Sequence, residues 1–543
     1  MLQIHGFFLL FLAFLIILVV KIVRDRRDRA AVTGTCKFTA IAAGMFVVLN
    51  LYWLLPALTV KETLLQQISS SDIFIFAPKP TSDLGVMFDL SAMYGFWRGG
   101  YTYANETLSV WWVLFAFLFY LAVLGFVYKL RDGRIGLVVW AFGLIWGAGL
   151  LLAAGAAIDF TRPAFEWLFD HSLFFRGFRD SQKFVALICL SYSFLGGLGV
   201  YQLARSSFFY KLRRARLPRI GTAALVGLAL VVPLVYCYPI FGFGGQLKPI
   251  DYPEAWYQVN DYLNEDDEDF NVLFLPWHMY MGYQWLPNRD KSLMNPAHRF
   301  FDKPVICGDN IEVGGIYSQS TNPISKYVEF LLKHKNQVDN FGELLAPLNV
   351  KYVVLVHEVD YKSYSFLYRQ QDLAIEREVE KLTIFRNEHF TTRTYAVDSV
   401  VYVRHLEEYL ELSSQQDVMQ HLYVLGEGAN DGNSTGVEQL ETRKITPVKY
   451  EIEGSDKQWG IFTVPQRVST DYWEYHGRGP EMKNLGLMPV FEVDEGGGKV
   501  TYSRFFHVYV AGYVISIMTL VILIAVYFSP AYRLKRSSKG TSR

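Results

Sequence analysis

The sequence predicts a polytopic α-helical membrane protein, with about seven transmembrane helices and a large external domain that joins an α/β part to a β-sandwich-like part. Three observations predict this class. Hydrophobic residues make up 51% of the 543 residues and charged residues only 19%. Apolar stretches of about 20 residues recur along the chain. One long polar stretch, residues 241–506, separates the last apolar stretch from the others.

Seven apolar segments are long enough to cross a hydrocarbon core. They lie near residues 6–23, 36–58, 109–128, 135–157, 184–204, 219–240 and 507–528. The polar segments between them alternate in basic content. Lys and Arg total 20 in residues 21–37, 129–134, 205–219 and 530–543, but only 7 in residues 59–108 and 158–183. Basic loops stay in the cytoplasm, so we expect a multi-pass protein of the cell membrane, with residues 241–506 outside and the C-terminus inside.

The expected domain order follows from these segments. A membrane domain with six helices covers residues 1–240, and the last helix, 507–528, leads into a basic cytoplasmic tail, 529–543. Between them, residues 241–410 are expected to form a mixed α/β domain and residues 411–506 a mainly β domain. The supporting patterns are a helix over 253–263 and strands over 271–277, 349–356, 380–387, 394–403, 445–453, 460–468 and 498–506.

Composition and motifs exclude several function classes. Lys plus Arg and Asp plus Glu number 52 each, which gives no support to a nucleic-acid partner. The four cysteines form no disulfide framework and no CxxC metal site. No HExxH or P-loop occurs, and no metal, cofactor or catalytic group can be named from local pattern. Asp266, Asp267 and Asp269 could hold a divalent cation, but a solvated turn is favoured because the Gly and terminal Glu of an EF-hand loop are missing.

A candidate anion site lies in the external loop at 158–183. An aromatic stretch there delivers Arg176, Arg179 and Lys183 to the start of the next apolar segment. Arg suits bidentate phosphate recognition, and a lipid phosphate would lie at that depth. The alternative is that these side chains reach along the membrane surface to water, or pair with Asp180 and Glu166. The sequence leaves both interpretations open.

The external loop at 59–108 carries acids and aromatic residues. Asp72, Asp83, Asp89 and Glu106 include a possible general base, although no pattern selects one. The aromatic stretch MYGFWRGGYTY at 93–103 could stack on sugar rings, but a belt of aromatic residues at the membrane interface is favoured.

The order of several segments resembles that of GT-C-type membrane glycosyltransferases. These segments are LNLYWLLPAL at 49–58, FFRGFRDSQKF at 174–184, DYPEAWYQVNDYL at 251–263, NVLFLPW at 271–277 and LNVKYVVLV at 348–356. Within that class the chain is similar to arabinofuranosyltransferase-like proteins, to the bacterial family linked to lipoteichoic-acid glycosylation, and to archaeal membrane proteins labelled 6-pyruvoyl-tetrahydropterin-synthase-related.

The resemblance implies a membrane lipid partner, a polyprenyl-phosphate sugar donor and an envelope glycan acceptor. It implies that Arg176, Arg179 and Lys183 bind the lipid phosphate. In GT-C enzymes the catalytic aspartate lies in the first external loop, and this chain is expected to begin several helices later. We therefore expect the C-terminal part of a transferase, with an upstream-encoded membrane subunit as a possible partner. The rival interpretation is a non-catalytic, membrane-anchored glycan-binding or assembly protein.

Overall fold

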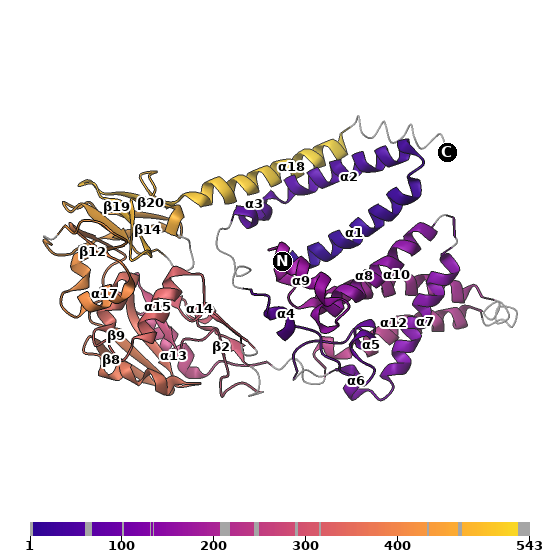
Figure 1. Ribbon diagram of the computed structural model, residues 1–543, viewed down its shortest axis with the longest axis horizontal. Helices are drawn as coiled ribbons and strands as arrows, with labels where there is room; N and C mark the ends of the chain where they lie inside the picture. The colour runs from indigo at the N-terminus through magenta and orange to yellow at the C-terminus, as the bar shows by residue number, and fades with distance from the viewer. Residues whose placement is uncertain are drawn as a thin grey trace. The chain divides into compact units, whose positions relative to one another are not determined.

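The chain forms two compact units. The computed structural model describes residues 4–59, 68–99, 103–130, 132–133, 135–206, 218–243, 249–287, 292–313, 316–431, 434–464 and 470–529. The helical unit comprises Met1–Ile41 and Ile68–Pro249, and the sheet unit comprises Ala42–Gln67 and Ile250–Arg543 (Figure 1). Apart from Ser529, the tail predicted over 529–543 lies outside the described residues.

Long apolar helices build the helical unit. Its α-helices are α1 (Ile4–Asp25), α4 (Asp72–Ile75), α5 (Val86–Ser91), α6 (Ala104–Thr107), α7 (Trp111–Lys129), α8 (Gly136–Ala154), α9 (Arg162–His171), α10 (Val185–Ala204) and α12 (Pro218–Tyr236), with α2 (Arg29–Leu49) beginning here and ending in the sheet unit. Helices α7 and α10 approach closely at two glycines. A Cβ at Gly199 would lie 1.9 Å from the Leu121 carbonyl oxygen, and a Cβ at Gly125 would lie 2.0 Å from the Leu195 carbonyl oxygen. Small residues at such contacts are typical of packed membrane helices.

Six of the described helices are long and apolar enough to cross a membrane, so the chain is a multi-pass membrane protein. They are His5–Asp25, Arg29–Leu49, Trp111–Lys129, Gly136–Ala157, Ser181–Ala204 and Phe505–Phe528. The segment predicted over 219–240 contains a shorter apolar helix, Ala223–Tyr236. The segment predicted over 36–58 differs from the prediction, because α2 ends at Leu49 and α3 (Leu51–Thr59) starts anew after Asn50.

A five-stranded α/β sheet organises the first part of the sheet unit. Its strand order is β4 (Val305–Ile306), β1 (Asn271–Leu275), β7 (Val350–Val356), β9 (Leu382–Asn387) and β8 (Leu373–Val379). Strands β4, β1 and β7 are parallel, whereas β9 runs antiparallel to β7 and to β8. Two short hairpins, β2 (Tyr280–Met281) with β3 (Leu293–Met294) and β5 (Ile311–Val313) with β6 (Ile316–Ser318), follow β1 and β4.

Helices on both faces bury this sheet. They are α13 (Glu254–Asn264), α14 (Ala297–Phe300), α15 (Pro323–Lys333), α16 (Phe341–Leu345) and α17 (Leu406–Ser413). Trp256 and Val259 of α13 pack with Phe274, while Tyr327 and Val328 of α15 pack with Leu273. Successive residues of β1 therefore face opposite helices, which explains why this strand reads as an unbroken apolar run.

Two antiparallel sheets form the second part of the sheet unit. One has the order β13 (Glu438–Leu440), β10 (Thr394–Val397), β16 (Trp459–Phe462), β19 (Met488–Glu492), β18 (Met482–Asn484). The other has the order β14 (Thr442–Thr446), β15 (Lys449–Ile452), β20 (Gly498–Tyr502), β17 (Trp473–Tyr475), and a parallel pair joins β11 (Ser399–Val403) to β12 (His421–Leu425). Phe462 of the first sheet packs 5.3 Å from Tyr450 and 5.1 Å from Trp473 of the second, so the two sheets share one core.

Several predicted strands are confirmed, and two are divided. The predicted strands over 271–277, 349–356 and 380–387 correspond to β1, β7 and β9. The run 394–403 is two strands in different sheets, and the run 445–453 spans the turn between β14 and β15. Of the segment predicted over 460–468, residues 465–469 lie outside the described residues.

The acidic turn after α13 is a set of ion pairs, which corrects the expectation of a solvated turn. Asp269 receives two hydrogen bonds from Arg393, at 2.5 Å from Nε and 2.6 Å from Nη2. Arg393 is 3% exposed and also donates from Nη1 to the Thr463 carbonyl oxygen at 3.0 Å. Asp266 pairs with Lys351 at 2.5 Å. The pair between Asp269 and Arg393 thereby ties the edge of β1 to the antiparallel sheets.

The last helix, α18 (Ala511–Phe528), runs along α3 within the sheet unit (Figure 1). A Cβ at Gly512 would lie 2.8 Å from the Leu51 carbonyl oxygen, so this glycine permits the close approach. Arg504 precedes the helix and donates from Nη2 to the Pro56 carbonyl oxygen at 2.9 Å and to Thr59 Oγ1 at 2.6 Å. The first and last parts of the sheet unit are therefore joined at the base of this helix.

We expect Asp269→Asn to destabilise the sheet unit by about 3 kcal/mol, because it leaves the buried Arg393 without its anion. Burial opposes ionisation of Asp269, but the hydrogen bonds and charge of Arg393 outweigh it and hold the pKa of Asp269 below its ordinary value of 3.8. A depressed pKa adds stability above pH 3.8 that is lost as the pH falls through the folded-state value. The difference in melting temperature between the variant and the wild type should shrink in acid. Equal melting temperatures at pH 7 would contradict this role.

Candidate functional site

An aromatic cluster positions three of the cations of the loop at 158–183, Arg176, Arg179 and Lys183. This loop contains α9 and two 3-10 helices, Phe175–Phe178 and Ser181–Phe184. The rings of Phe175, Phe178 and Phe184 are buried and lie 4.9–6.0 Å apart. Because the cations alternate with these anchored rings, their backbone positions are fixed.

A close backbone approach holds the second 3-10 helix. Ser181 donates from Oγ to the Ala153 carbonyl oxygen at 2.8 Å. A Cβ at Gly155 would lie 2.4 Å from Ser181 Oγ, and Gly155 has a φ of +51°. Only glycine fits both constraints at the end of α8.

Arg179 is held by an anion from the loop at 59–108. Its Nη1 lies 2.5 Å from Oδ2 of Asp72, which is 1% exposed. The guanidinium also lies 4.2 Å from the ring centre of Phe76. The partner of Arg179 is therefore Asp72, rather than the Asp180 or Glu166 considered from the sequence.

Lys183 and Arg176 form no short ion pair with any described residue, although the charges of Lys183 and Asp180 attract each other. Lys183 donates from Nζ to the Gly177 carbonyl oxygen at 3.1 Å and lies 3.5 Å from Nε2 of His5. His5 itself contacts the same carbonyl oxygen at 2.7 Å. The Nε of Arg176 is buried, and no described residue accepts its hydrogen bond. Both cations therefore keep donor capacity for an anion.

Asp180 lies between Arg179 and Lys183 in the chain. Burial raises the pKa of Asp180 above its ordinary value of 3.8. The charge of Lys183, a hydrogen bond from Trp97 and the charge of Arg179 lower the pKa, but by less. Its Oδ1 is buried, and no described residue donates a hydrogen bond to it. A carboxylate with a raised pKa and an open oxygen has the properties of a general base.

The other acids of the loop at 59–108 have different roles. Asp89 is fully buried and accepts hydrogen bonds from the backbone N–H groups of Thr81 and Ser82 at 2.7 and 3.0 Å. It therefore shapes the loop. Asp83 and Glu106 are exposed. The aromatic stretch at 93–103 packs inside the helical unit, since Tyr94 lies 5.8 Å from Trp111 and 5.7 Å from Tyr236; residues 100–102 lie outside the described residues.

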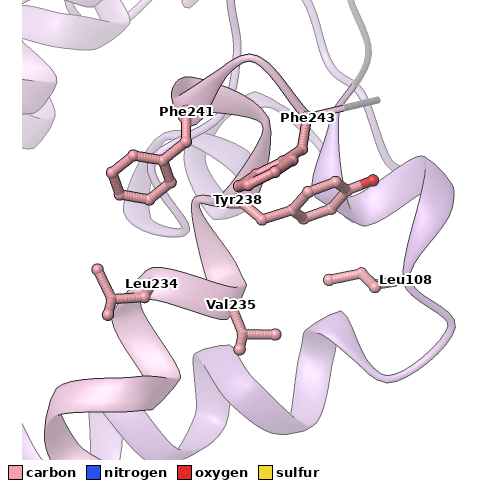
Figure 2. A pocket seen from close by; sticks show the side chains of 6 residues that line it. All are labelled: Leu108, Leu234, Val235, Tyr238, Phe241 and Phe243. Atoms are coloured by element: carbon pink, nitrogen blue, oxygen red, sulfur yellow. The ribbon is translucent and has the colours of Figure 1, made fainter. Parts of the chain in front are cut away.

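An apolar hollow of about 490 Å³ lies beside the end of α12 (Figure 2). Its lining consists of Leu108, Leu234, Val235, Tyr238, Phe241 and Phe243. The Tyr238 hydroxyl contacts Thr107 Oγ1 at 2.6 Å, so the one polar group of the lining is already engaged. Such a surface suits a hydrocarbon chain rather than a polar ligand.

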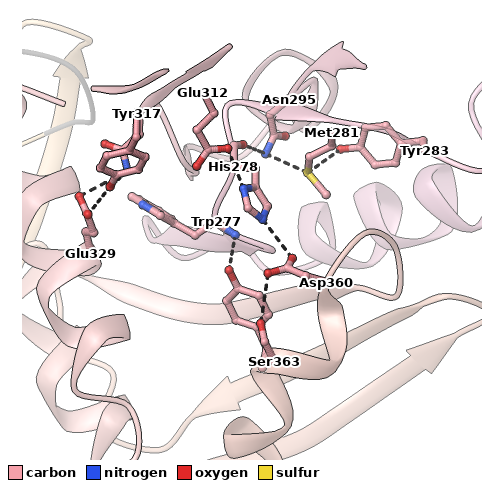
Figure 3. Close-up of polar contacts among 12 residues, drawn as sticks. Trp277, His278, Met281, Tyr283, Asn295, Glu312, Tyr317, Glu329, Asp360 and Ser363 are labelled. Atoms are coloured by element: carbon pink, nitrogen blue, oxygen red, sulfur yellow. Dashed lines mark hydrogen bonds and ion pairs between the residues drawn. The ribbon is translucent and has the colours of Figure 1, made fainter. Parts of the chain in front are cut away.

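A polar cluster that was not predicted from the sequence lies in the sheet unit (Figure 3). His278, which follows β1, lies between two carboxylates: its Nδ1 is 2.8 Å from Oε2 of Glu312, and its Nε2 is 3.1 Å from Oδ1 of Asp360. Beside it, the Tyr317 hydroxyl and the Asn310 amide both donate to Glu329, which also pairs with Lys333 at 3.0 Å. These residues come from segments that are far apart in the sequence, including the β5–β6 hairpin and α15, and meet near the carboxyl end of β1.

The cluster fixes a charged imidazole. Hydrogen bonds to Asp360 and Glu312 raise the pKa of His278 to about 10, so both ring nitrogens donate at neutral pH. Gly308 permits this arrangement, because a Cβ there would lie 2.6 Å from the backbone nitrogen of His278. The only sequence signal was position: His278 directly follows a predicted central strand.

Comparisons with known proteins give similarity to one enzyme. No protein-family model and no curated protein matches the chain. Among solved structures, the chain is similar to the cryo-EM structure of arabinofuranosyltransferase AftD from Mycobacteria, at 11% identity and a TM-score of 0.40 over 86% of this chain and 42% of that one. A structure of a point mutant of that enzyme gives 11% identity and a TM-score of 0.36, with 86% and 44% covered. The chain spans less than half the length of these proteins.

We expect His278→Phe to lower stability by about 1 kcal/mol near pH 6, because Glu312 and Asp360 lose a shared cation while water still screens them. The raised pKa of His278 contributes its full stabilisation of the folded protein below the ordinary value of 6.5. This stabilisation is lost as the pH rises toward 10. The loss in melting temperature should therefore fade in alkali. His389→Phe, at an exposed position of the same unit, is the matched control. A loss that does not change with pH would contradict the charged imidazole.

Proposed function

We propose that this chain acts as a membrane glycosyltransferase, alone or with a further membrane subunit. It would transfer a sugar from a polyprenyl-phosphate donor to a glycoconjugate of the cell envelope. The observation that carries the proposal is the combination of Arg176 and Lys183, which have spare donor capacity, with the half-buried acid Asp180 at the start of an apolar helix.

The two cations supply the phosphate contacts in this proposal. Arg presents a planar fork of donors, and Lys a compact charge, and both bind phosphate oxygens. Arg179 is committed to Asp72, so its part is to position the turn and to add positive potential. The apolar hollow beside α12 offers a surface for the prenyl chain.

Asp180 is the proposed base. It would accept the proton of an acceptor hydroxyl while the hydroxyl oxygen forms a bond to the anomeric carbon of the sugar. The bond between that carbon and the phosphate oxygen breaks, and the polyprenyl phosphate leaves with the electron pair. Arg176 and Lys183 would stabilise the negative charge that develops on the leaving phosphate.

The proposed orientation follows from the distribution of basic residues. The loops at 59–108 and 158–183 would face outward, and so would the cation cluster that Arg176, Arg179 and Lys183 form. The sheet-rich domain would face outward as well. An acceptor glycan of the envelope would then be on the same side as the lipid phosphate. The proposed domains are those expected from the sequence, with residues 241–410 and 411–506 outside the membrane.

A second candidate is a non-catalytic glycan-binding or assembly protein. The ion pair between Arg179 and Asp72 favours it, because this pair satisfies one of the three cations and one acid without any ligand. In that case Asp180 and the remaining cations would only shape the loop.

We expect the double variant Arg176→Met/Lys183→Met to bind undecaprenyl phosphate about 100-fold more weakly than the wild type, because two charge-assisted hydrogen bonds are lost. Asp180→Asn should keep this binding but lose sugar transfer from an undecaprenyl-phosphate donor to an envelope glycan. Arg179 is left intact in these variants because Asp72 would otherwise be buried without a partner.

The matched control is Arg162→Ala, which removes a cation of the same loop that already pairs with Asp159 at 2.8 Å. It should leave lipid binding and transfer unchanged. Unchanged lipid affinity in the double variant would refute the phosphate site. Lipid binding without any transfer in the wild type would favour the non-catalytic candidate.

A further inference from the structure

A cavity of about 360 Å³ opens near the carboxyl end of β7, in the α/β part of the sheet unit. Its side-chain lining includes two indoles and four polar groups: Trp256, Trp285, Gln284, Glu358, Glu380 and Lys381. The carboxyl end of parallel strands is where α/β sheets bind ligands. The cavity is separate from the cation cluster, which belongs to the helical unit.

Two connections bring the polar groups together. Glu358 follows β7 after one intervening residue, and Glu380 with Lys381 forms the turn between β8 and β9. The His357 N–H donates to the Lys381 carbonyl oxygen at 2.7 Å, which fixes the turn against the end of β7.

The cavity offers both donors and acceptors. Glu358 is 2% exposed, and its Oε2 accepts the Gln284 N–H at 3.1 Å. Lys381 Nζ lies 3.6 Å from Glu358 Oε1 and donates to the Gln284 side-chain oxygen at 2.8 Å. A buried carboxylate held by one backbone donor and one loosely placed ammonium has capacity for a further donor.

Both polar connections carry strained backbone. Val359, next to Glu358, has a φ of +55°, and Glu380, next to Lys381, has a φ of +48°. The left-handed region is unfavourable for any residue with a Cβ and most unfavourable for a β-branched one. Such strain collects at binding sites, where the surrounding structure holds side chains in a set geometry.

The indoles give the cavity rigid apolar faces. Trp256 is buried and stacks on Phe301, with ring centres 5.5 Å apart and planes 9° apart. Trp285 is only partly buried, and its ring lies 4.9 Å from Tyr283 and 5.4 Å from Tyr252. The ring at the cavity is thus fixed by its neighbours before any ligand arrives.

We propose that this cavity binds a neutral sugar residue of a glycan, with the ring against Trp285 and its hydroxyl groups hydrogen-bonded to Glu358, Gln284 and Lys381. A sugar presents C–H groups on its faces and both donors and acceptors at its edge, which the lining matches. Glu358 and Glu380 outnumber Lys381, so an anion such as a phosphate is disfavoured. The ammonium of Lys381 disfavours a quaternary ammonium ligand, for which aromatic walls and acids would otherwise be suited.

This inference rests on the proposed function only for the source of the glycan, which would be the envelope acceptor. Glycan binding requires no lipid donor and no Asp180. The two proposals can therefore fail independently.

The test uses the full chain in lipid nanodiscs and isothermal titration calorimetry with neutral hexasaccharides of mannose, galactose and arabinose. At least one hexasaccharide should bind. Trp285→Ala should weaken that binding at least about tenfold, and Lys381→Met, at an exposed turn, about threefold. Tyr257→Ala is the matched control, because Tyr257 is an exposed ring of α13 outside the lining. It should bind as the wild type does.

Three results would overturn the proposal. They are the absence of binding of every hexasaccharide, wild-type affinity in a Lys381→Met protein that keeps its melting temperature, and binding of choline or inorganic phosphate at this cavity in place of the sugars. If sugar transfer fails while hexasaccharide binding and its loss in Trp285→Ala persist, the cavity stands and the transferase proposal alone is wrong.

Discussion

The cost of removing charge from water governs the helical unit. Its long helices α7, α8 and α10 are almost wholly apolar, so an ionised group at their ends must find a partner or remain costly. Asp72 and Arg179 meet this requirement, since a fully buried carboxylate binds a guanidinium that is also covered by Phe76. This pair joins the loops at 59–108 and 158–183. It leaves Arg176, Lys183 and Asp180 half-buried, and no described residue satisfies the Nε of Arg176 or the Oδ1 of Asp180. A phosphate ligand would accept the hydrogen bond of Arg176, and an acceptor hydroxyl would donate to Asp180; this is the physical basis of the proposed function.

In the sheet unit, charged groups that are removed from water are paired by side chains that are distant in the sequence. Arg393 neutralises Asp269 between the α/β part and the antiparallel sheets, and His278 neutralises Glu312 and Asp360 at the end of β1. In each case one cation is shared by groups that the fold brings together. The carboxyl end of the parallel strands thereby becomes a rigid polar surface, which is the kind of edge at which α/β sheets bind ligands.

Periodicity and length predicted the elements that depend on local pattern. The apolar helices and the buried strands β1 and β7 are visible in the sequence because their residues are mostly apolar, and β9 is visible because its residues have strand-like periodicity. The helix break at Asn50 was missed, because its flanks are apolar and only the contacts of α3 with α18 select it. The run 394–403 was predicted as one strand because Asp398 alone does not mark a change of sheet. The partner of Arg179 lies 107 residues away, and the partner of Arg393 lies 124 residues away. The two partners of His278 lie 34 and 82 residues away, so no local pattern could identify any of these partners.

The proposed function requires that the cation cluster of the helical unit holds a lipid phosphate. Native mass spectrometry of the protein, extracted from its own membrane in mild detergent, tests this most directly. We expect a bound polyprenyl phosphate that survives mild activation. A membrane subunit that co-purifies would be consistent with the proposed function. A protein that carries no lipid, or only bulk phospholipid that exchanges freely, would contradict the proposed lipid-phosphate site.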